Sequence, residues 1–287
     1  MVAKKVSIIN MKGGVGKTTL AFNLALYLSE VEKCKVLLID FDPQANATLI
    51  GLSEEEYDNQ LKTKKTIADL FINCYLQYGP FPNKREVKIN IDELKFRRYE
   101  SEDKKYFFDI IPSELNLSFI LRGVHIGPFE LEDAIIKKCE NEYYYIIIDC
   151  APTNSILTTL ALNATKSVLI PVMADSFAVY GVELMKEIIK DHETDYFYDT
   201  KETIKIIGLV FTMWDHTLSA PQHQYEYSKK IIDHWGEKTF ESKIWSNNWY
   251  KVANGIRGVG SFLDTPAHDE VKKEFIKFVN EFIKNMM

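Results

Sequence analysis

The chain has 287 residues, of which 46% are hydrophobic and 26% are charged, and its formal net charge is −6. This composition is typical of a globular protein with a sizeable core, and it excludes a largely disordered chain. The acidic balance argues against strong non-specific DNA binding by the isolated chain, because dedicated nucleic-acid binders are usually basic.

The sequence shows neither a membrane span nor a secretion signal. The longest apolar run, Tyr143–Ile148, is much shorter than the roughly 20 residues that a membrane-spanning helix needs. Lys4 and Lys5 precede no apolar stretch of signal-peptide length. The four cysteines lack zinc-ligand spacing, which favours reduced thiols in a reducing compartment. We therefore expect a cytoplasmic protein that does not bind a membrane.

Apolar, β-branched segments alternate with helical patterns along the chain. The expected strands are Lys5–Asn10, Lys35–Asp40, Phe107–Ile111, Tyr144–Asp149, Ser167–Val172 and Ile204–Phe211. The expected helices are Lys17–Ser29, Thr66–Cys74, Leu131–Glu140, Ile156–Asn163, Val179–Glu193, Gln222–Trp235 and Glu270–Lys284. Several strands are apolar on consecutive residues, as strands covered on both faces require. The pattern predicts one α/β domain over residues 1–287, with a mostly parallel, twisted sheet and helices on both faces.

Residues 53–106 break this alternation because they are polar and highly charged. Basic clusters at Lys62–Lys65, Lys84–Arg85 and Lys95–Arg98 are interspersed with acidic residues. A run of charges is usually a solvated face. The alternative is an insertion that contacts a partner beside the active site, and the sequence leaves both interpretations open.

A phosphate-binding loop is predicted directly after the first strand. Residues 12–19 read KGGVGKTT and a helical pattern follows, which is the strand–loop–helix context of such loops. Glycines let the backbone curl, so that successive N–H groups point inward at a helix N-terminus and bind an anion. The predicted nucleotide-binding residues of the loop are Lys12, Gly13, Gly14, Val15, Gly16, Lys17, Thr18 and Thr19.

Three side chains of this loop have specific expected roles. Lys17 would place its charge between the β- and γ-phosphates, the Thr18 hydroxyl would bind Mg²⁺, and Thr19 would donate to the α-phosphate. The strict motif has a glycine where this chain has Met11. The chain is therefore predicted to be a P-loop NTPase with a departure from the usual loop sequence.

Two apolar strands end in aspartate. Residues 146–149 read IIID, and residues 37–40 read LLID, followed by Phe41 and Asp42. Ligands of open α/β sheets bind at the carboxyl ends of the strands, so we expect these carboxylates at the edge that carries the loop. Asp149 is expected to hold a Mg²⁺-bound water.

These segments resemble the ParA/MinD family of deviant Walker ATPases, and within it the ParA/Soj-type partition proteins. The resemblance rests on Lys12–Thr19 as KGGVGKTT, Asp40–Thr48 as DFDPQANAT and Ile146–Pro152 as IIIDCAP. It extends over residues 1–52 and 107–215 and is thin in the charged insertion and the C-terminal quarter.

The resemblance implies a homodimer that forms with ATP and Mg²⁺ and encloses two nucleotides face to face. Lys12 would reach the partner's phosphates, and Asp42 would position the attacking water, so that Lys12, Lys17 and Asp42 are the expected catalytic residues. Thr18, Asp42 and Asp149 are the expected residues at the metal. Hydrolysis would be slow, and a ParB-like partner would accelerate it.

The nucleotide base is inferred from the end of the strand over residues 204–211. A guanine site would carry an Asn-Lys-x-Asp motif there, whereas this chain has Thr212–Asp215 as TMWD, so ATP is favoured over GTP. Met213 is the expected nucleotide contact in this segment. The related proteins often have a proline-containing adenine loop, and Ile244–Asn247 replaces it here, which leaves that part of the pocket unassigned.

Two functional hypotheses follow. The first is a ParA-type ATPase that partitions a plasmid or chromosome through non-specific DNA or a DNA-bound partner. The candidate DNA contacts are Lys229, Lys230, Lys243, Lys251 and Arg257, and these residues are as readily explained as solvated surface.

The second hypothesis is a relative that positions or regulates a protein cargo without binding DNA, which the acidic charge favours. A small-molecule kinase is less favoured, since no acceptor site or lid is marked. The chain begins at its first strand, so we do not expect site-specific operator binding. The stripe of helix Glu270–Lys284 is typical of core rather than of a membrane-binding tail.

Overall fold

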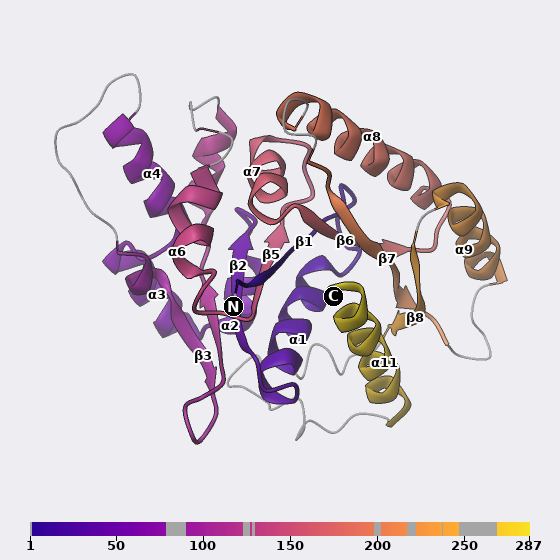
Figure 1. Cartoon of the computed structure of the whole chain (residues 1–287), viewed down its shortest axis with the longest axis horizontal. Helices are drawn as coiled ribbons and strands as arrows, with labels where there is room; N and C mark the ends of the chain where they lie inside the picture. Colours follow the sequence, from indigo (N-terminus) through magenta and orange to yellow (C-terminus); the bar gives the residue numbers. More distant parts are fainter. Residues whose placement is uncertain are drawn as a thin grey trace.

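The computed structural model describes residues 2–78, 90–122, 127, 130–197, 202–216, 222–236, 238–246 and 269–287. Within these residues the chain forms a single α/β domain around an eight-stranded sheet of order β3-β4-β2-β5-β1-β6-β7-β8 (Figure 1). The strands are β1 (Lys4–Ile8), β2 (Lys35–Phe41), β3 (Phe96–Glu100), β4 (Phe107–Ile111), β5 (Tyr145–Cys150), β6 (Ser167–Met173), β7 (Lys205–Trp214) and β8 (Thr239–Trp245).

Helices of three kinds connect these strands in the described residues. The α-helices are α1 (Lys17–Glu30), α2 (Asn46–Gly51), α3 (Glu54–Thr63), α4 (Ile67–Tyr78), α5 (Ile91–Leu94), α6 (Lys137–Cys139), α7 (Ile156–Thr165), α8 (Ala178–Tyr196), α9 (Gln222–Trp235) and α11 (Asp269–Asn285). The 3₁₀-helix η1 spans Leu115–Arg122 and the π-helix η2 spans Glu132–Ile136. None of the helices so described is both long and apolar enough to span a bilayer.

All strand pairs are parallel in this part of the chain except β3–β4, which is antiparallel. The central strand β5 lies between β2 and β1, with Asp149 opposite Asp40 on one side and opposite Ile8 on the other. The loop after β1 and the aspartates at the ends of β2 and β5 therefore lie at the same edge of the sheet.

The core lies on both faces of the sheet, because successive residues of the central strands point to opposite sides. Ile146 and Ile148 pack on the face that α7 and α8 cover. Ile147 packs on the face that α1 and α11 cover (Figure 1). On this second face, Tyr27 of α1 meets Phe275 of α11 with ring centroids 6.0 Å apart. The predicted arrangement of a parallel sheet between two layers of helices is confirmed.

Each of the six expected strands is present, with its ends shifted by at most three residues. The helix expected over Leu131–Glu140 differs in kind, since it is the π-helix η2 followed by the short α6. The edge strands β3 and β8 were not predicted. In β3 every residue is half-buried or exposed, and in β8 buried residues alternate with more exposed ones, so neither shows the continuous apolar run of the central strands.

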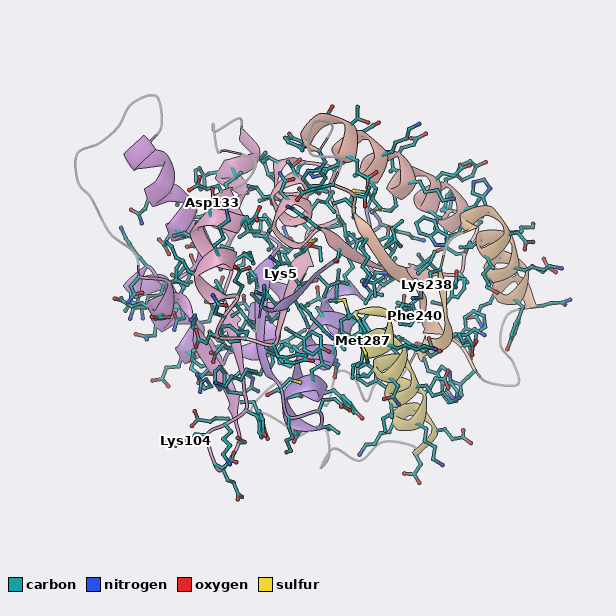
Figure 2. The ribbon with its side chains drawn as sticks, viewed as in Figure 1. Lys5, Lys104, Asp133, Lys238, Phe240 and Met287 are labelled. Carbon is teal, nitrogen blue, oxygen red and sulfur yellow. The ribbon has the colours of Figure 1, made fainter. Side chains whose placement is uncertain are left out.

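The charged insertion contributes one of these edge strands. Arg97 of β3 forms an ion pair with Asp109 of β4, and the guanidinium carbon lies 3.8 Å from the centre of the Phe107 ring. Tyr143 donates a hydrogen bond of 2.6 Å to the same carboxylate, which is 2% exposed. This basic residue therefore fixes the edge of the sheet, whereas Lys104 lies at the exposed turn between β3 and β4 (Figure 2). Lys84–Arg85 lies outside the described residues.

A buried histidine links two helices on the α7–α8 face. The Nε2 atom of His192 on α8 lies 2.8 Å from Oδ1 of Asn163 on α7, and the histidine is 5% exposed. Burial lowers the pKa of His192 from 6.5 to about 4, and the charge of Asp195 offsets a small part of this shift. The folded protein therefore holds His192 neutral at pH values where the unfolded chain binds a proton.

We expect His192 to make stability depend on pH. A depressed folded pKa contributes stability that is complete above about pH 6.5 and is lost as the pH falls towards 4. The free energy of unfolding should fall more steeply for the wild type than for His192→Gln over this window, by up to about 3 kcal/mol. Urea unfolding at several pH values measures the difference, and parallel curves for the two proteins would contradict the assignment.

Candidate functional site

The loop between β1 and α1 has the backbone geometry that an anion site requires. Gly14 and Gly16 have φ angles of 75° and 81°, in the left-handed region that favours glycine. Gly16 is the N-cap residue of α1, so the amides after it point out of the helix N-terminus. Lys17, Thr18 and Thr19 form the first turn of this helix. The loop predicted from the sequence is therefore curled as expected.

The side chain of Lys17 lies against the loop and faces acidic groups. It is 6% exposed, and its ammonium donates to the carbonyl of Lys12 at 3.1 Å. Burial lowers the pKa of Lys17, and the charges of Asp149, Cys150 and Asp42 oppose that shift. The structure thus brings the loop lysine and the two predicted metal-site aspartates into one electrostatic environment.

Asp40 is buried, and both of its carboxylate oxygens accept hydrogen bonds from groups of its own chain. One carboxylate oxygen accepts hydrogen bonds from the Thr48 amide at 2.8 Å and from the Thr48 hydroxyl at 2.6 Å. The other oxygen accepts from the Asp42 amide at 3.3 Å. Burial nevertheless raises the pKa of Asp40 to about 7. This aspartate fixes the turn that carries Asp42 and the start of α2.

Asp149 has the opposite character. It is 1% exposed, and neither of its carboxylate oxygens accepts a hydrogen bond of normal length, the Thr18 hydroxyl being the nearby donor. Its pKa is raised well above the usual carboxyl value, first by burial and then by the charge of Asp40, while Thr18 and Lys17 act in the lowering direction. A buried carboxylate without a partner is a place where a cation fits.

The chemistry of these donors fits a magnesium ion that is shared with a phosphate ligand. The Thr18 hydroxyl and the carboxylates of Asp42 and Asp149 are the hard oxygen ligands that Mg²⁺ prefers. No group of three or more His, Cys, Asp or Glu side chains is arranged to hold a metal in the described part of the chain. This is expected for Mg²⁺, which usually binds one or two carboxylates together with substrate phosphates and water.

Asp42 lies in the turn between β2 and α2. It is 7% exposed, and one of its oxygens accepts a hydrogen bond of 2.9 Å from the Gln44 amide. This bond orients the carboxylate at the same edge as the loop. Its position suits the expected role beside a reacting phosphate.

The end of β7 lies over the phosphate-binding loop. The Thr212 hydroxyl donates to the carbonyl of Val15 at 2.7 Å, and both residues are buried. Met213 has a φ of 51° and is 40% exposed, and its terminal carbon lies 3.4 Å from where a Cβ on Gly16 would stand. The structure therefore places Met213 at the loop, and its contact with a nucleotide stays a prediction. Sequence reasoning did not find Thr212, whose role depends on a contact across 197 positions.

The neighbouring strand end carries an aromatic pair. Trp245 of β8 stacks on His216, with ring centroids 3.9 Å apart and nearly parallel planes. The Ser246 amide donates to the carbonyl of Trp214 at 2.8 Å, which ties the ends of β7 and β8 together. Asn247, the last residue of the segment that replaces the adenine loop, lies outside the described residues.

Lys12, which is expected to reach a partner, is held inside its own chain. Its amide donates to Oδ1 of Asn10 at 2.9 Å, and its ammonium forms an ion pair with Asp175. Asp175 lies between β6 and α8. No local sequence pattern singles out this aspartate.

The candidate DNA contacts are distributed over other elements. Lys229 and Lys230 are exposed on α9, and the Lys243 ammonium lies 4.3 Å from the centre of the Trp214 ring. Lys251 and Arg257 lie outside the described residues. The described lysines of this set are thus on α9 and β8 and not on the phosphate-binding loop.

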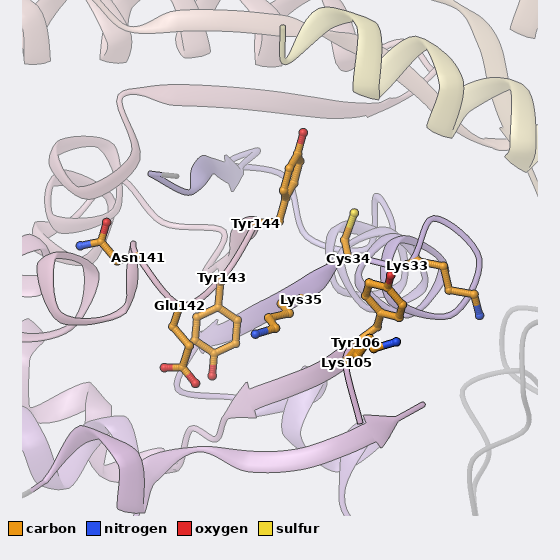
Figure 3. A pocket seen from close by; sticks show the side chains of 9 residues that line it. All are labelled: Lys33, Cys34, Lys35, Lys105, Tyr106, Asn141, Glu142, Tyr143 and Tyr144. Carbon is orange, nitrogen blue, oxygen red and sulfur yellow. The ribbon is translucent and has the colours of Figure 1, made fainter. Parts of the chain in front are cut away.

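A cavity of about 230 Å³ lies at the amino ends of the strands, opposite the candidate nucleotide site (Figure 3). Its lining residues are Lys33, Cys34, Lys35, Lys105, Tyr106, Asn141, Glu142, Tyr143 and Tyr144. They lie at or just before the amino ends of β2, β4 and β5, whereas the loop and aspartates lie at the carboxyl ends. Burial and Glu32 raise the pKa of the Cys34 thiol to about 11, so this cysteine is protonated and unreactive at neutral pH. The cavity is separate from the candidate nucleotide site.

The fold and the loop geometry together define a P-loop nucleotide-binding α/β protein. Residues 3–206 match a family model described as an AAA domain. The chain is 32% identical over 248 residues to the chromosome-partitioning ATPase Soj of Treponema pallidum, covering 85% of this chain and 83% of that protein. The chain therefore belongs to the AAA-domain family and, within it, to the ParA/Soj partition ATPases, which confirms the resemblance seen in the sequence.

Solved structures share the fold at lower identity. The ATP complex of an McdA variant from Cyanothece has a TM-score of 0.71 and 21% identity, covering 98% of this chain and 96% of that one. A plasmid partition protein from Borrelia burgdorferi has a TM-score of 0.69 and 22% identity, covering 99% of both chains. These likenesses show that the chain shares its fold with these proteins.

We expect the Thr212 hydroxyl to stabilise the loop measurably. Thr212→Val keeps the shape of the side chain but leaves the buried carbonyl of Val15 without this donor, at a cost of about 1–3 kcal/mol in the free energy of unfolding. Thr212→Ser retains the hydroxyl and is the matched control. Urea unfolding without nucleotide makes the comparison, and equal stability of the Val variant and the wild type would exclude this role.

Proposed function

We propose that this protein is a cytoplasmic, ATP-dependent switch that binds ATP with Mg²⁺, forms a homodimer and hydrolyses ATP slowly in plasmid or chromosome partition. The observation that carries the proposal is the unpartnered, buried carboxylate of Asp149 beside the buried ammonium of Lys17 at the mouth of a curled phosphate-binding loop. The relationship to the partition ATPase Soj supports the same proposed function.

Nucleotide binding is assigned to the loop and to the end of β7. The amides of Gly13 through Thr19 donate to the phosphates, and Lys17 supplies the positive charge between the β- and γ-phosphates. The Thr18 hydroxyl, Asp42 and Asp149 hold the metal, directly or through water. Met213, whose side chain lies close to Gly16, contacts the nucleotide from the end of β7. Bound Mg²⁺ supplies neutralisation of charge on the phosphate oxygens.

Hydrolysis then requires positioning more than covalent chemistry by the protein. The Asp42 carboxylate, which the Gln44 amide orients, holds the water in line with the terminal phosphate. Lys17 and the partner subunit's loop lysine, equivalent to Lys12, stabilise the charge that develops on the phosphate oxygens. A site that depends on a second subunit is slow in the isolated chain, which suits a switch whose state is timed by hydrolysis.

The ATP dimer has two candidate classes of partner. In the first, the ATP dimer binds DNA non-specifically through basic residues such as Lys229 and Lys230 and is activated by a ParB-like protein. In the second, the dimer positions a protein cargo without DNA, which the net charge of −6 favours. A gel shift with ATP but not with ADP, weakening as salt rises, supports the DNA reading because phosphate contacts release counterions.

The molecular mass in solution tests the switch. We expect the wild type to have twice the mass of one chain with ATP and Mg²⁺ and the mass of one chain with ADP, by size-exclusion chromatography with light scattering. Lys17→Ala removes the charge that the phosphates need, so it should lose nucleotide binding and stay monomeric. Adding duplex DNA in a parallel run separates the two partner classes. A wild type that stays monomeric with ATP would refute the proposal.

Asp42→Ala tests the role in hydrolysis separately from binding. Removing the carboxylate should leave ATP affinity within a few-fold of the wild type and reduce the hydrolysis rate by at least 100-fold, since general-base or water-positioning groups contribute about that much. The ATP dimer of this variant should therefore persist. Phosphate release measured over time provides the readout, and a normal rate for Asp42→Ala would show that another group positions the water.

A further inference from the structure

The outer edge of β8 is covered by side chains rather than by another strand. β8 is the last strand of the sheet and pairs with β7 on one side, and no strand in the described part of the chain pairs with its other side. An open strand edge presents unpaired N–H and C=O groups, which are a template for a further strand. The groups that contact this edge therefore decide whether another chain can pair with it.

Two glutamates of α11 accept hydrogen bonds from this edge. One carboxylate oxygen of Glu281 accepts from the Glu241 amide at 3.1 Å, and the other accepts from the Ser242 amide at 3.3 Å. The Ser242 hydroxyl donates to Glu281 at 3.1 Å, and the Lys243 amide donates to Glu274 at 3.1 Å. Three successive N–H groups of β8 therefore bind carboxylates and not the carbonyls of a neighbouring strand.

The placement of the two glutamates follows from the helix repeat. Glu274 and Glu281 are about two helical turns apart, so both lie on the same side of α11. Phe278, which lies between them in the sequence, meets Phe240 of β8 with ring centroids 5.3 Å apart. The buried apolar stripe of α11 thus holds the helix against β8 (Figure 1), and the glutamates on its flank reach the edge of the strand.

Carboxylates oppose the addition of a strand at this edge in two ways. They satisfy the N–H groups through charge-assisted hydrogen bonds, which are stronger than bonds between neutral groups. They also place negative charge where the carbonyl oxygens of an incoming strand would lie, and this charge repels those oxygens. We propose that Glu274 and Glu281 close the β8 edge and thereby keep a second copy of the chain from pairing with it.

The association that the glutamates prevent is edge-to-edge pairing of two identical chains. A two-fold axis brings the same strand of both copies together, so two β8 edges would pair antiparallel. Such a dimer would need no nucleotide and would use a different surface from the phosphate-binding loop. The inference goes beyond the proposed function, because it concerns the chain without ATP. Closing this edge leaves self-association to other surfaces, such as the nucleotide-binding edge of the proposed switch.

The double variant Glu274→Ala, Glu281→Ala tests the inference, because alanine favours a helix and its side chain accepts no hydrogen bond. Sedimentation without nucleotide, over a range of protein concentrations, is the measurement. The mean mass of the variant should rise from one chain towards two chains as concentration increases, whereas the wild type should stay at one chain. Glu226→Ala combined with Glu270→Ala removes two exposed carboxylates from α9 and the start of α11, and this matched control should behave as the wild type.

Amide hydrogen exchange locates the surface that associates. At low concentration, the amides of Glu241, Ser242 and Lys243 should exchange about 10- to 100-fold faster in the double variant than in the wild type, because each loses a hydrogen bond to a charged group. At high concentration, protection should return to this segment, since the β8 strand of the second copy supplies carbonyl acceptors.

A double variant that unfolds like the wild type and stays a single chain at every concentration overturns the inference. Association without renewed protection of residues 241–243 also overturns it, because the contact would then lie elsewhere. If the double variant does not fold, Glu281→Ala takes its place with the same expectation, since Glu281 accepts three of the four hydrogen bonds. All these measurements lack ATP, so a wild type that forms no ATP dimer would refute the proposed function and leave this inference standing.

Discussion

Lys17 lies buried among aspartates at the carboxyl edge of the sheet, and the rest of the candidate site depends on how these charges are compensated. Lys17 is 6% exposed, and Asp40 and Asp149 are 0% and 1% exposed. Removing charged groups from water is costly unless they face one another or a ligand. Burial accordingly lowers the pKa of Lys17 and raises that of each aspartate. A polyanion bound together with a divalent cation relieves both penalties at once.

The order of the strands explains why these groups meet. β5 lies between β2 and β1, so the aspartates that end β2 and β5 face the loop that follows β1. On the other side of β1, β6 and β7 bring Asp175 and Thr212 to the same edge. One edge of a parallel sheet therefore gathers residues separated by up to 197 positions in the sequence. The charged insertion lies elsewhere, at the lateral side of the sheet formed by β3, where Arg97 pairs with Asp109 of β4.

The sequence was sufficient for the features that have a local cause. Gly14 and Gly16 require a left-handed backbone, and the apolar run Ile146–Ile148 requires a strand covered on both faces, so the loop and the central strands could be predicted. The strands β3 and β8 lie at the sheet edges and lack that run, and for this reason they were missed. Thr212 and Asp175 act through contacts with the loop that no local pattern encodes.

The sequence pattern cannot distinguish Asp40 from Asp149. Both close an apolar strand with the same Ile-Asp ending, and they stand opposite each other in the sheet. The chain supplies Thr48 to Asp40, through an amide and a hydroxyl, and Thr48 is itself held by the Ser113 amide at 2.8 Å. For Asp149 the nearby donor is the Thr18 hydroxyl, which makes no hydrogen bond of normal length to it. Two carboxylates that look alike in the sequence therefore differ in the structure: Thr48 and the Asp42 amide hold Asp40, which fixes the fold of the turn, whereas Asp149 has no such set of donors and is where we propose the cation.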